Sequence, residues 1–315
     1  MKALIADSYG PPSQLRLTEI KTTELKDGYV LVRLHAAAVN PFDVKLIGGA
    51  LKERFPVEFP HVPGMDGAGV IAGVGEDVEG YTIGERVFGL FHESGTLAEF
   101  ATIGGTDPRL AHLPDELDFE RAAAIPEAGL TAVTIVRASD IHEDQHVFIL
   151  GATGGIGLFA IQLLKARGAH VIVTAKPADT GYVRTLGAEE VIDYGAGDPI
   201  VELGKRYPDG VDVVIDLINS GDALLRSAGA VRRDGTLVSP LGGPAQSAFP
   251  EDVNVRYVML DARAGDLADL ARRAASGELK IEIAETYPFA QAKQALADLA
   301  DPKEHTRGKR VVSIP

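Results

Sequence analysis

A glycine-rich stretch between residues 146 and 160 carries the clearest chemical signal in this sequence. Its first five residues read as a buried strand, and the glycine turn that follows leads into an apolar segment with helical spacing. Such a turn lets backbone N–H groups and the positive end of a helix face a pyrophosphate, and missing side chains allow close approach. Glycines alone would also fit an ordinary tight turn between a strand and a helix. The flanking strand, helix and next strand favour a dinucleotide site, with Thr153, Gly154, Gly155, Ile156 and Gly157 as cofactor-binding residues.

The end of the next expected strand bears on which dinucleotide is bound. NAD sites usually end this strand with Asp or Glu, which accepts the ribose hydroxyls. A 2′-phosphate instead requires that acid to be absent and a donor or cation to be present. Thr174, Ala175 and Lys176 supply the second arrangement, so NADPH is the predicted cofactor. The alternative for Lys176 is a solvated lysine beside Pro177.

The elements that position these residues follow from the apolar pattern. From His146 onward, strand-like apolar runs alternate with helix-like stretches, which predicts an α/β fold with a doubly wound parallel sheet. Residues 1 to 120 read instead as short strands separated by Gly and Pro. An amphipathic helix is expected at Leu267–Ala275, before a final strand, helix and strand. The expected strands of the alternating part are Val147–Leu150, Val171–Thr174, Glu190–Tyr194, Val211–Leu217, Thr236–Leu241 and Val255–Leu260.

Composition restricts the class of protein further. A chain of 315 residues, 45% apolar and 24% charged, can bury a large core and form about two domains. The absence of cysteine excludes disulfides and thiolate metal sites, and the net charge of −14 opposes binding to nucleic acid. No run of eighteen apolar residues occurs, and Asp7 interrupts the first apolar residues. We therefore expect no membrane partner and a cytoplasmic setting.

Several short blocks, taken in order, resemble the medium-chain dehydrogenase/reductase superfamily, and specifically its zinc-free quinone oxidoreductase and enone reductase branch. The resemblance covers essentially the whole chain, and many blocks in one order are far more specific than any one of them. Besides the glycine turn, the blocks are Met1-Lys2-Ala3, Tyr9-Gly10 and residues 36–45, 63–70, 84–89, 129–132, 186–188, 191–194 and 307–309.

The resemblance implies a division of labour along the chain. Residues 1–120 and 277–315 are expected to form a GroES-like, barrel-type catalytic domain. Residues 121–276 are expected to form a Rossmann NADPH-binding domain inserted between them, with the active site in the cleft and two copies of the chain in a homodimer.

The resemblance also bears on metal chemistry. Zinc-containing relatives carry Cys where Asn40 stands and His-Glu where Met65-Asp66 stand, and the eight histidines here do not recur at metal-ligand spacing. Without a Lewis acid, hydride must go to an acceptor already activated by conjugation. The sequence therefore predicts a zinc-independent, NADPH-dependent reductase of a quinone or an α,β-unsaturated carbonyl compound.

Two residues of the block Asn-Pro-Phe-Asp-Val-Lys are expected near the chemistry. By resemblance, Lys45 lies beside the nicotinamide and the substrate, where its charge can stabilise an oxyanion; the alternative is a surface lysine on a helical turn. Asn40 is expected to line the nicotinamide pocket through its amide, or to be a turn residue ahead of Pro41. Asp43 and Asp66 are given structural roles rather than paired acid–base chemistry.

The remaining cofactor positions rest on the resemblance. Thr131 matches a position near the nicotinamide, unless its hydroxyl caps a helix. Tyr194 matches a tyrosine that approaches the adenosine 2′-phosphate, unless it packs on a strand. Further cofactor-binding residues by resemblance are Ile218, Leu241, Gly242, Gly243, Arg307 and Gly308.

Two other functions fit the same residues. One is a free-standing enoyl reductase acting on acyl thioesters, because the superfamily contains such domains. The other is an NADPH-binding structural or sensor protein with little turnover. Incubation with NADPH and a panel of acceptors distinguishes these three hypotheses.

Overall fold

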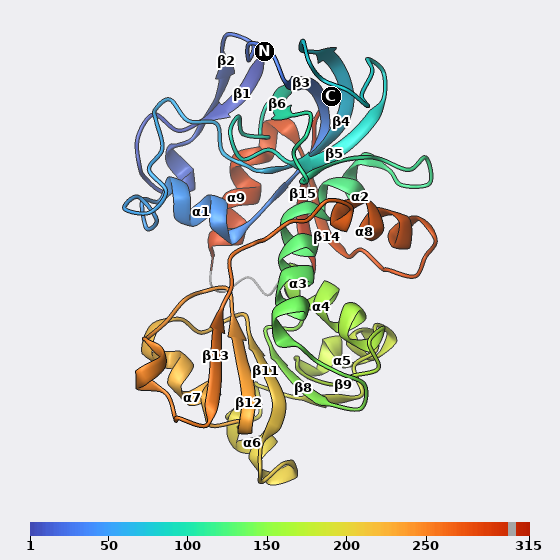
Figure 1. Ribbon diagram of the computed structural model, residues 1–315. Coiled ribbons are helices and arrows are strands. Elements are labelled where there is room, and N and C mark those ends of the chain that lie inside the picture. The colour runs from blue at the N-terminus through green and yellow to red at the C-terminus, as the bar shows by residue number, and fades with distance from the viewer. Residues whose placement is uncertain (302–306) are drawn as a thin grey trace. The chain divides into compact units, whose positions relative to one another are not determined.

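The computed structural model describes residues 1–301 and 307–315, which form two compact units (Figure 1). Unit 1 comprises Met1–Glu127 and Ala262–Pro315, and unit 2 comprises Ala128–Asp261. These limits differ from the domain boundaries predicted at residues 120 and 276. The main difference is helix α8 (Asp266–Ala275), which packs against strand β7 (Leu110–His112) and so belongs to unit 1.

Unit 2 is built on a six-stranded parallel sheet with the order β10-β9-β8-β11-β12-β13. Its first strand, β8, lies in the middle, and the chain builds outward to one edge and then to the other. This is the doubly wound order of a Rossmann fold, in which ligands bind where the order reverses, here between β8 and β11. The strands are β8 (His146–Leu150), β9 (His170–Thr174), β10 (Glu190–Ile192), β11 (Val211–Asp216), β12 (Val231–Ser239) and β13 (Val253–Tyr257).

Helices cover the sheet of unit 2, which explains why its strands are apolar almost throughout. Phe148 and Leu150 on β8 share a core with Leu203 and Leu224 from the helices that follow β10 and β11. Val147 and Ile149, which alternate with them along β8, face the opposite side of the sheet and are also fully buried. The helices are α3 (Pro126–Ser139), α4 (Gly155–Lys165), α5 (Pro177–Thr185), α6 (Pro199–Arg206) and α7 (Leu224–Ala228).

Unit 1 contains a mostly antiparallel sheet in which β3 is central. The sheet has the order β14-β15-β3-β4-β5-β7, and β6 also pairs with β3. Segments from the beginning and the very end of the chain therefore meet side by side on β3. The strands are β3 (Tyr29–Val39), β4 (Asp66–Val74), β5 (Arg86–Leu90), β6 (Phe100–Gly104), β7, β14 (Ile283–Pro288) and β15 (Lys309–Ser313), with β1 (Lys2–Ile5) and β2 (Arg16–Glu19) forming a separate pair.

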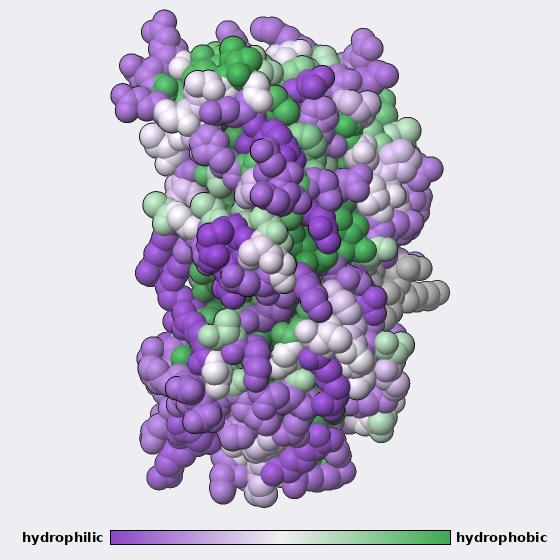
Figure 2. All heavy atoms as spheres, turned by 90° about the vertical axis from the view of Figure 1, so that its right-hand side faces the viewer, coloured by the Kyte–Doolittle hydropathy of each residue, from purple (hydrophilic) through white to green (hydrophobic). Residues whose placement is uncertain are grey.

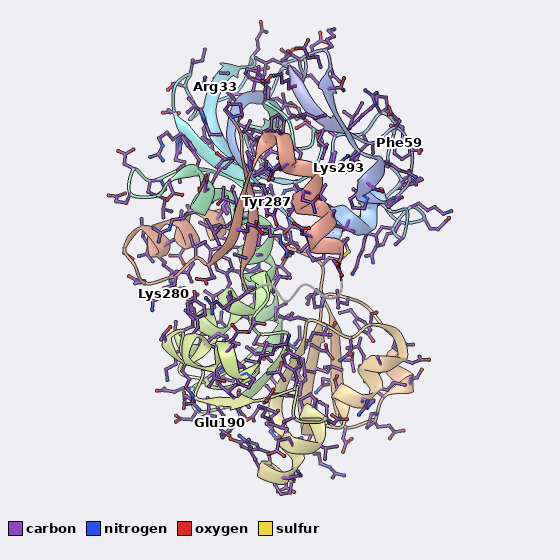
Figure 3. All side chains as sticks on the ribbon, turned by 180° about the vertical axis from the view of Figure 1, so that it is seen from behind. Arg33, Phe59, Glu190, Lys280, Tyr287 and Lys293 are labelled. Carbon is purple, nitrogen blue, oxygen red and sulfur yellow. The ribbon has the colours of Figure 1, made fainter. Side chains whose placement is uncertain are left out.

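Short helices pack in unit 1. They are α1 (Pro41–Ile47), α2 (Phe119–Ala123) and α9 (Ala292–Ala300). Helix α2 contacts β3 and β4, α9 contacts β14 and β15, and α1 contacts α9. Tyr287, labelled in Figure 3, lies in the apolar core with 3% of its surface exposed. Its hydroxyl is hydrogen-bonded to the carboxyl groups of Glu285 and Asp298, so β14 and α9 are joined at their polar margin.

The outer surface is largely hydrophilic on the face that Figure 2 presents, with apolar side chains in small groups between charged ones. This agrees with the acidic composition, in which 45 Asp and Glu residues face 31 Lys and Arg residues. Within residues 1–301 and 307–315, no helix combines the length and the apolar character needed to cross a bilayer.

Candidate active site

The predicted glycine turn joins β8 to α4 in unit 2. Gly151 has a φ of 85°, in the left-handed region that glycine adopts without strain. At Gly157 a Cβ would lie 2.5 Å from the carbonyl oxygen of Gly151, so any side chain would collide with backbone. At Gly154 a Cβ would meet only that same oxygen, at 3.5 Å, which leaves space in front of the helix. The backbone therefore offers the N–H groups of the first turn of α4 to an anion, and all five predicted residues from Thr153 to Gly157 lie here.

Thr174, at the end of β9, has a different role from the one predicted. Its side chain is 2% exposed, and its hydroxyl donates to the carbonyl oxygen of Ile149 at 3.3 Å. The same hydroxyl accepts the N–H of Gly151 at 3.2 Å. Because both functions of the hydroxyl are engaged inside the protein, Thr174 braces the glycine turn and is not the phosphate donor that the sequence suggested. The reason is that the side chain points along the sheet toward β8.

Lys176 and Tyr194 follow the carboxyl ends of two neighbouring strands. Thr174 on β9 lies opposite Ile192 on β10, so each of these two residues stands two positions beyond a paired residue. Lys176 is partly exposed at the N-cap of α5, and Tyr194 is 38% exposed, which does not support packing on a strand. Burial, together with Asp179 and Asp193, raises the pKa of Tyr194, so its hydroxyl remains a donor. Ala175, which directly follows β9, is fully buried.

The reversal point of the sheet is organised by Asp216, which sequence reasoning missed. This buried carboxylate ends β11 and accepts the backbone N–H groups of Ile218 at 3.0 Å and Asn219 at 2.8 Å. It also accepts the hydroxyl of Ser227. The loop is thereby fixed with Ile218 59% exposed and close to Gly151. An acid ending an apolar strand was the signal available in the sequence.

The other predicted residues of unit 2 occupy two places. Leu241, Gly242 and Gly243 follow the carboxyl end of β12, where the N–H of Leu241 donates to Ser239 and Gly242 has a φ of 72°. Thr131 lies within α3 with 5% exposure, well inside the helix. A capping role for its hydroxyl is therefore wrong.

In unit 1 the structure assembles a buried polar cluster around Asn40. The Nδ2 atom of Asn40 donates to Oδ2 of Asp66 at 3.0 Å, and the ammonium of Lys309 donates to Oδ1 of Asn40. Lys309 also forms an ion pair with Asp66, at 3.1 Å. The other oxygen of Asp66 accepts the backbone N–H of Glu127 at 2.8 Å. Asn40, Asp66 and Lys309 are all at most 6% exposed.

This cluster contains more carboxyl groups than cations. Burial raises the pKa of Asp43 to about 8, although the backbone N–H of Asn40 donates to its carboxylate at 2.8 Å. Burial likewise raises the pKa of Glu127 to about 7. Lys309 is paired with Asp66, and a second anion beside this pair costs free energy. The surroundings of Asp43 therefore favour its protonated form.

The predicted residues Lys45, Arg307 and Gly308 lie elsewhere in unit 1. Lys45 is exposed on α1, five positions after Asn40. Arg307 forms an ion pair with Glu282 at 2.8 Å. Gly308 has a φ of 88°, and a Cβ there would lie 2.3 Å from the carbonyl oxygen of Glu282. Arg307 and Gly308 therefore fix the chain immediately before Lys309.

Lys309 is the main residue that sequence reasoning missed in unit 1. The available signal was its position in the block Arg307-Gly308-Lys309, directly before the apolar run of β15. A lysine that begins a buried strand needs a partner, but the partner is 243 residues away in the chain.

Comparison with known proteins follows from these two regions. Residues 26–114 match the family model described as alcohol dehydrogenase GroES-like domain, and residues 186–312 match the one described as zinc-binding dehydrogenase. The human protein named NAD(P)H oxidoreductase RTN4IP1, mitochondrial, is 31% identical over 361 residues, covering 100% of this chain and 89% of that protein. A tomato (Solanum lycopersicum) protein named 2-methylene-furan-3-one reductase is 32% identical over 79% of this chain and 64% of its own length. The crystal structure of Escherichia coli quinone oxidoreductase complexed with NADPH superimposes with a TM-score of 0.89 at 25% identity, over 100% of both chains.

The chain belongs to the medium-chain dehydrogenase/reductase superfamily, in its quinone oxidoreductase branch. The predicted family and fold class, a Rossmann sheet with a GroES-like domain, are confirmed.

The donor set of this medium-chain dehydrogenase/reductase does not fit a zinc site, although one matching family model is described as zinc-binding. Asn40 and Asp66 are hydrogen-bonded to each other and both contact Lys309. The carboxylate of Asp66 therefore already has an ammonium group as its partner. Across the described ranges, no group of three or more His, Asp or Glu side chains could hold a metal ion. We therefore derive no step through zinc.

The cytoplasmic setting expected for this superfamily member is contradicted. Four relatives of 30% to 32% identity, which match the whole chain, carry the designation mitochondrial in their names. The apolar pattern reveals only an apolar membrane or secretory segment. The lack of such a segment does not distinguish the cytoplasm from a mitochondrion or another compartment.

Proposed function

We propose that this chain transfers hydride from NADPH to a quinone or an α,β-unsaturated carbonyl compound. In the overall reaction the acceptor gains a hydride and a proton while NADPH becomes NADP⁺. The observation that supports this most directly is the glycine turn at the reversal point of a sheet whose strand order is that of a Rossmann fold. The names of the relatives agree, because they include an NAD(P)H oxidoreductase, a quinone oxidoreductase bound to NADPH and an enone reductase.

The preference for NADPH over NADH is assigned to Lys176 and Tyr194. Each of them stands two positions beyond the register pair Thr174–Ile192 of β9 and β10, and no acid ends β9. A lysine ammonium and a protonated phenol are both donors, so together they suit a phosphate and not a pair of ribose hydroxyls. The pyrophosphate is assigned to the turn from Thr153 to Gly157.

The remaining cofactor contacts are assigned along the same edge and in unit 1. Ile218 and the segment from Leu241 to Gly243 follow the carboxyl ends of β11 and β12, where a dinucleotide crosses a Rossmann sheet. Thr131, Arg307 and Gly308 are assigned to the cofactor by family resemblance alone.

The nicotinamide supplies the hydride, so the tasks of the protein are alignment and stabilisation of the charge that develops on the acceptor oxygen. Asn40 is proposed to contact the nicotinamide region through its amide. Lys45 is proposed to stabilise the developing oxyanion, and its exposure leaves its ammonium available for this role. We further propose that the reaction requires no zinc, since Lys309 supplies the positive charge beside Asp66.

A kinetic assay tests the proposal. Purified protein is incubated with NADPH or NADH and with a set of quinones, enones and crotonyl-type thioesters, and oxidation of the cofactor is followed at 340 nm. We expect turnover with quinones or enones and preference for NADPH. Turnover confined to thioesters would assign the chain to enoyl-thioester reduction, and tight NADPH binding without oxidation would make it a binding protein.

The same chain is proposed to form a homodimer. Among residues 1–301 and 307–315, strand β13 is the last strand of the parallel sheet and pairs only with β12, so the backbone groups of its outer side face away from β12. Its residues Arg256 and Tyr257 are exposed. An edge of this kind can pair with another strand. Light scattering coupled to gel filtration should give twice the 33.3 kDa mass of the chain.

A further inference from the structure

The amide of Asn40 is held at both of its ends, by two groups of opposite hydrogen-bonding character. The ammonium of Lys309 can only donate, so the Asn40 atom that it contacts must be the carbonyl oxygen. The carboxylate of Asp66 can only accept, so the Asn40 atom 3.0 Å from it must be the NH₂ nitrogen. The two possible orientations of an asparagine amide are therefore distinguished here by chemistry.

Lys309 and Asp66, which we call the clamp, are both held in place by the sheet. Strand β15 pairs with β3 so that Arg310 lies opposite Val39, which places Lys309 opposite Asn40. Strand β4 pairs with β3 on the other side, with Asp66 opposite Ala38. Asp66 is fixed in turn by the backbone N–H of Glu127 and by the ammonium of Lys309. Both groups thus come from strands that flank β3, the strand that ends directly before Asn40.

One donor of the clamped amide is left over. An asparagine NH₂ group has two N–H bonds, and the contact with Asp66 uses one of them. Asn40 is 1% exposed, and among residues 1–301 and 307–315 the second N–H has no acceptor. Buried donors are almost always satisfied in native proteins, so this one indicates a ligand atom that accepts a hydrogen bond.

We propose that Lys309 and Asp66 are positioning residues that fix the amide of Asn40, so that Asn40 offers an N–H, and never its oxygen, to a carbonyl oxygen of the bound ligands. The inference rests on the proposed function, which supplies two such oxygens. One is the carboxamide oxygen of the nicotinamide, and the other is the carbonyl oxygen of the acceptor. A flipped amide would turn its own oxygen toward that atom and repel it.

A double-mutant cycle tests the positioning role. Asn40→Ala removes the donor, and Lys309→Met removes the charge and the hydrogen bond while it retains an unbranched side chain. We expect each single variant to lower kcat/KM for an enone, Asn40→Ala by about 100-fold. In the Asn40→Ala background, Lys309→Met should have almost no further effect, because there is no amide left to orient. Equal losses in both backgrounds would overturn the proposal and make Lys309 a purely structural residue.

Two more variants keep the test decisive if Lys309→Met folds poorly. Lys309→Arg retains a group that only donates, and should keep activity within about threefold of the wild type. Asn40→Asp matches the size of asparagine but presents only oxygen atoms, and should be at least as inactive as Asn40→Ala. Full activity in Asn40→Asp would exclude a donor role for residue 40.

The two candidate oxygens are separated by cofactor binding. NADPH affinity is measured by fluorescence titration without acceptor. If the N–H binds the nicotinamide carboxamide, Asn40→Ala should raise the Kd of NADPH about tenfold; if it binds the acceptor, the Kd should stay unchanged and the loss should appear with the enone alone. Absence of wild-type turnover with every acceptor would refute the proposed function itself. If the variants of Asn40 and Lys309 bind NADPH and turn over as the wild type does, the positioning role of Lys309 and Asp66 is refuted and the proposed function is not.

Discussion

At the carboxyl end of the parallel sheet in unit 2, the candidate site is made mostly of backbone, whereas in unit 1 it is made of buried charged side chains. The turn from Gly151 to Gly157 works because side chains are missing, and Lys176 and Tyr194 follow the carboxyl ends of β9 and β10 with their side chains at least partly exposed. Around Asn40, in contrast, Asp66 and Lys309 are almost fully buried and bind each other. Anion binding by backbone tolerates solvent, but a buried ion pair depends on every partner being present.

This difference decides how each region should respond to mutation. Changes at the exposed margin of unit 2 should alter cofactor affinity and leave folding intact. Changes near the cluster of unit 1 should alter turnover or stability and leave affinity for the adenosine end of NADPH intact.

The largest effect is expected for Lys45→Met, which keeps the length of the side chain and removes its charge. Loss of one preorganised electrostatic donor typically costs ~2.7–4 kcal/mol of transition-state stabilisation, or about 10²–10³ in rate. Enone turnover should fall by this order while NADPH binds normally, and quinones, which are more electrophilic, should be less affected. Lys52→Met, at another exposed lysine nearby, is the control and should behave as the wild type. Unchanged turnover with both acceptors would return Lys45 to a surface lysine.

The next effect concerns Lys176→Glu in unit 2. The substitution replaces the cation proposed to contact the 2′-phosphate with an anion, and a charge-assisted contact is worth roughly 1.5–3 kcal/mol, or about one to two decades of affinity. NADPH binding should weaken by that amount and NADH binding much less, as measured by titration of each cofactor. Lys205→Glu, on α6 in the same unit, is the matched control. Equal weakening of both cofactors would refute the assignment to the 2′-phosphate.

A smaller effect, dependent on pH, is expected for Asp43→Asn in unit 1. The folded-state pKa of Asp43 is raised to about 8, so its contribution to stability is full below the unfolded value of 3.8 and is lost as pH rises toward 8. The slope for one group is at most ~1.4 kcal/mol per pH unit. Asparagine cannot ionise, so the variant should lose less stability between pH 5 and 8 in urea unfolding. Parallel pH curves for wild type and variant would show that Asp43 ionises freely.

The smallest effect is expected for metal removal. Elemental analysis of the purified protein should show no stoichiometric zinc, and incubation with a chelator should leave turnover unchanged. Zinc that is bound and lost together with activity would replace the mechanism proposed for unit 1.

The two regions also differ in how far the sequence could predict them. The dinucleotide turn is recognisable locally, because its glycines and the start of its helix lie in seven consecutive residues, although the brace from Thr174 comes from the next strand. Each expected strand of unit 2 overlaps one of β8 to β13, but only Val147–Leu150 and Val171–Thr174 lie wholly within the observed strands, and the expected strand Thr236–Leu241 begins five residues late. β12 starts at Val231, but the polar residues around Asp234, which has a φ of 59°, interrupt the apolar run from which a strand is predicted.

The cluster in unit 1 could not be predicted in this way. Asn40, Asp66, Glu127 and Lys309 are spread over most of the chain, and only the pairing of β3 with β4 and β15 brings them together. Asn40 and Asp66 were recognised through the family, and Asp66 was given a structural role without its partner. Lys309 was seen only as part of a matching block. Similarly, Thr174 was assigned by its position at a strand end, while the direction of its side chain depends on the neighbouring strand.

The brace formed by Thr174 has a consequence for cofactor redesign. The usual route from NADPH to NADH specificity places an acid at the end of the second Rossmann strand. In this chain that substitution would remove the hydroxyl that holds Gly151 and would put a carboxylate in a site with 2% exposure. Specificity and the shape of the pyrophosphate turn are thus linked through one side chain. A redesign that leaves Thr174 in place and alters the partly exposed position 176 and the exposed position 194 avoids this linkage.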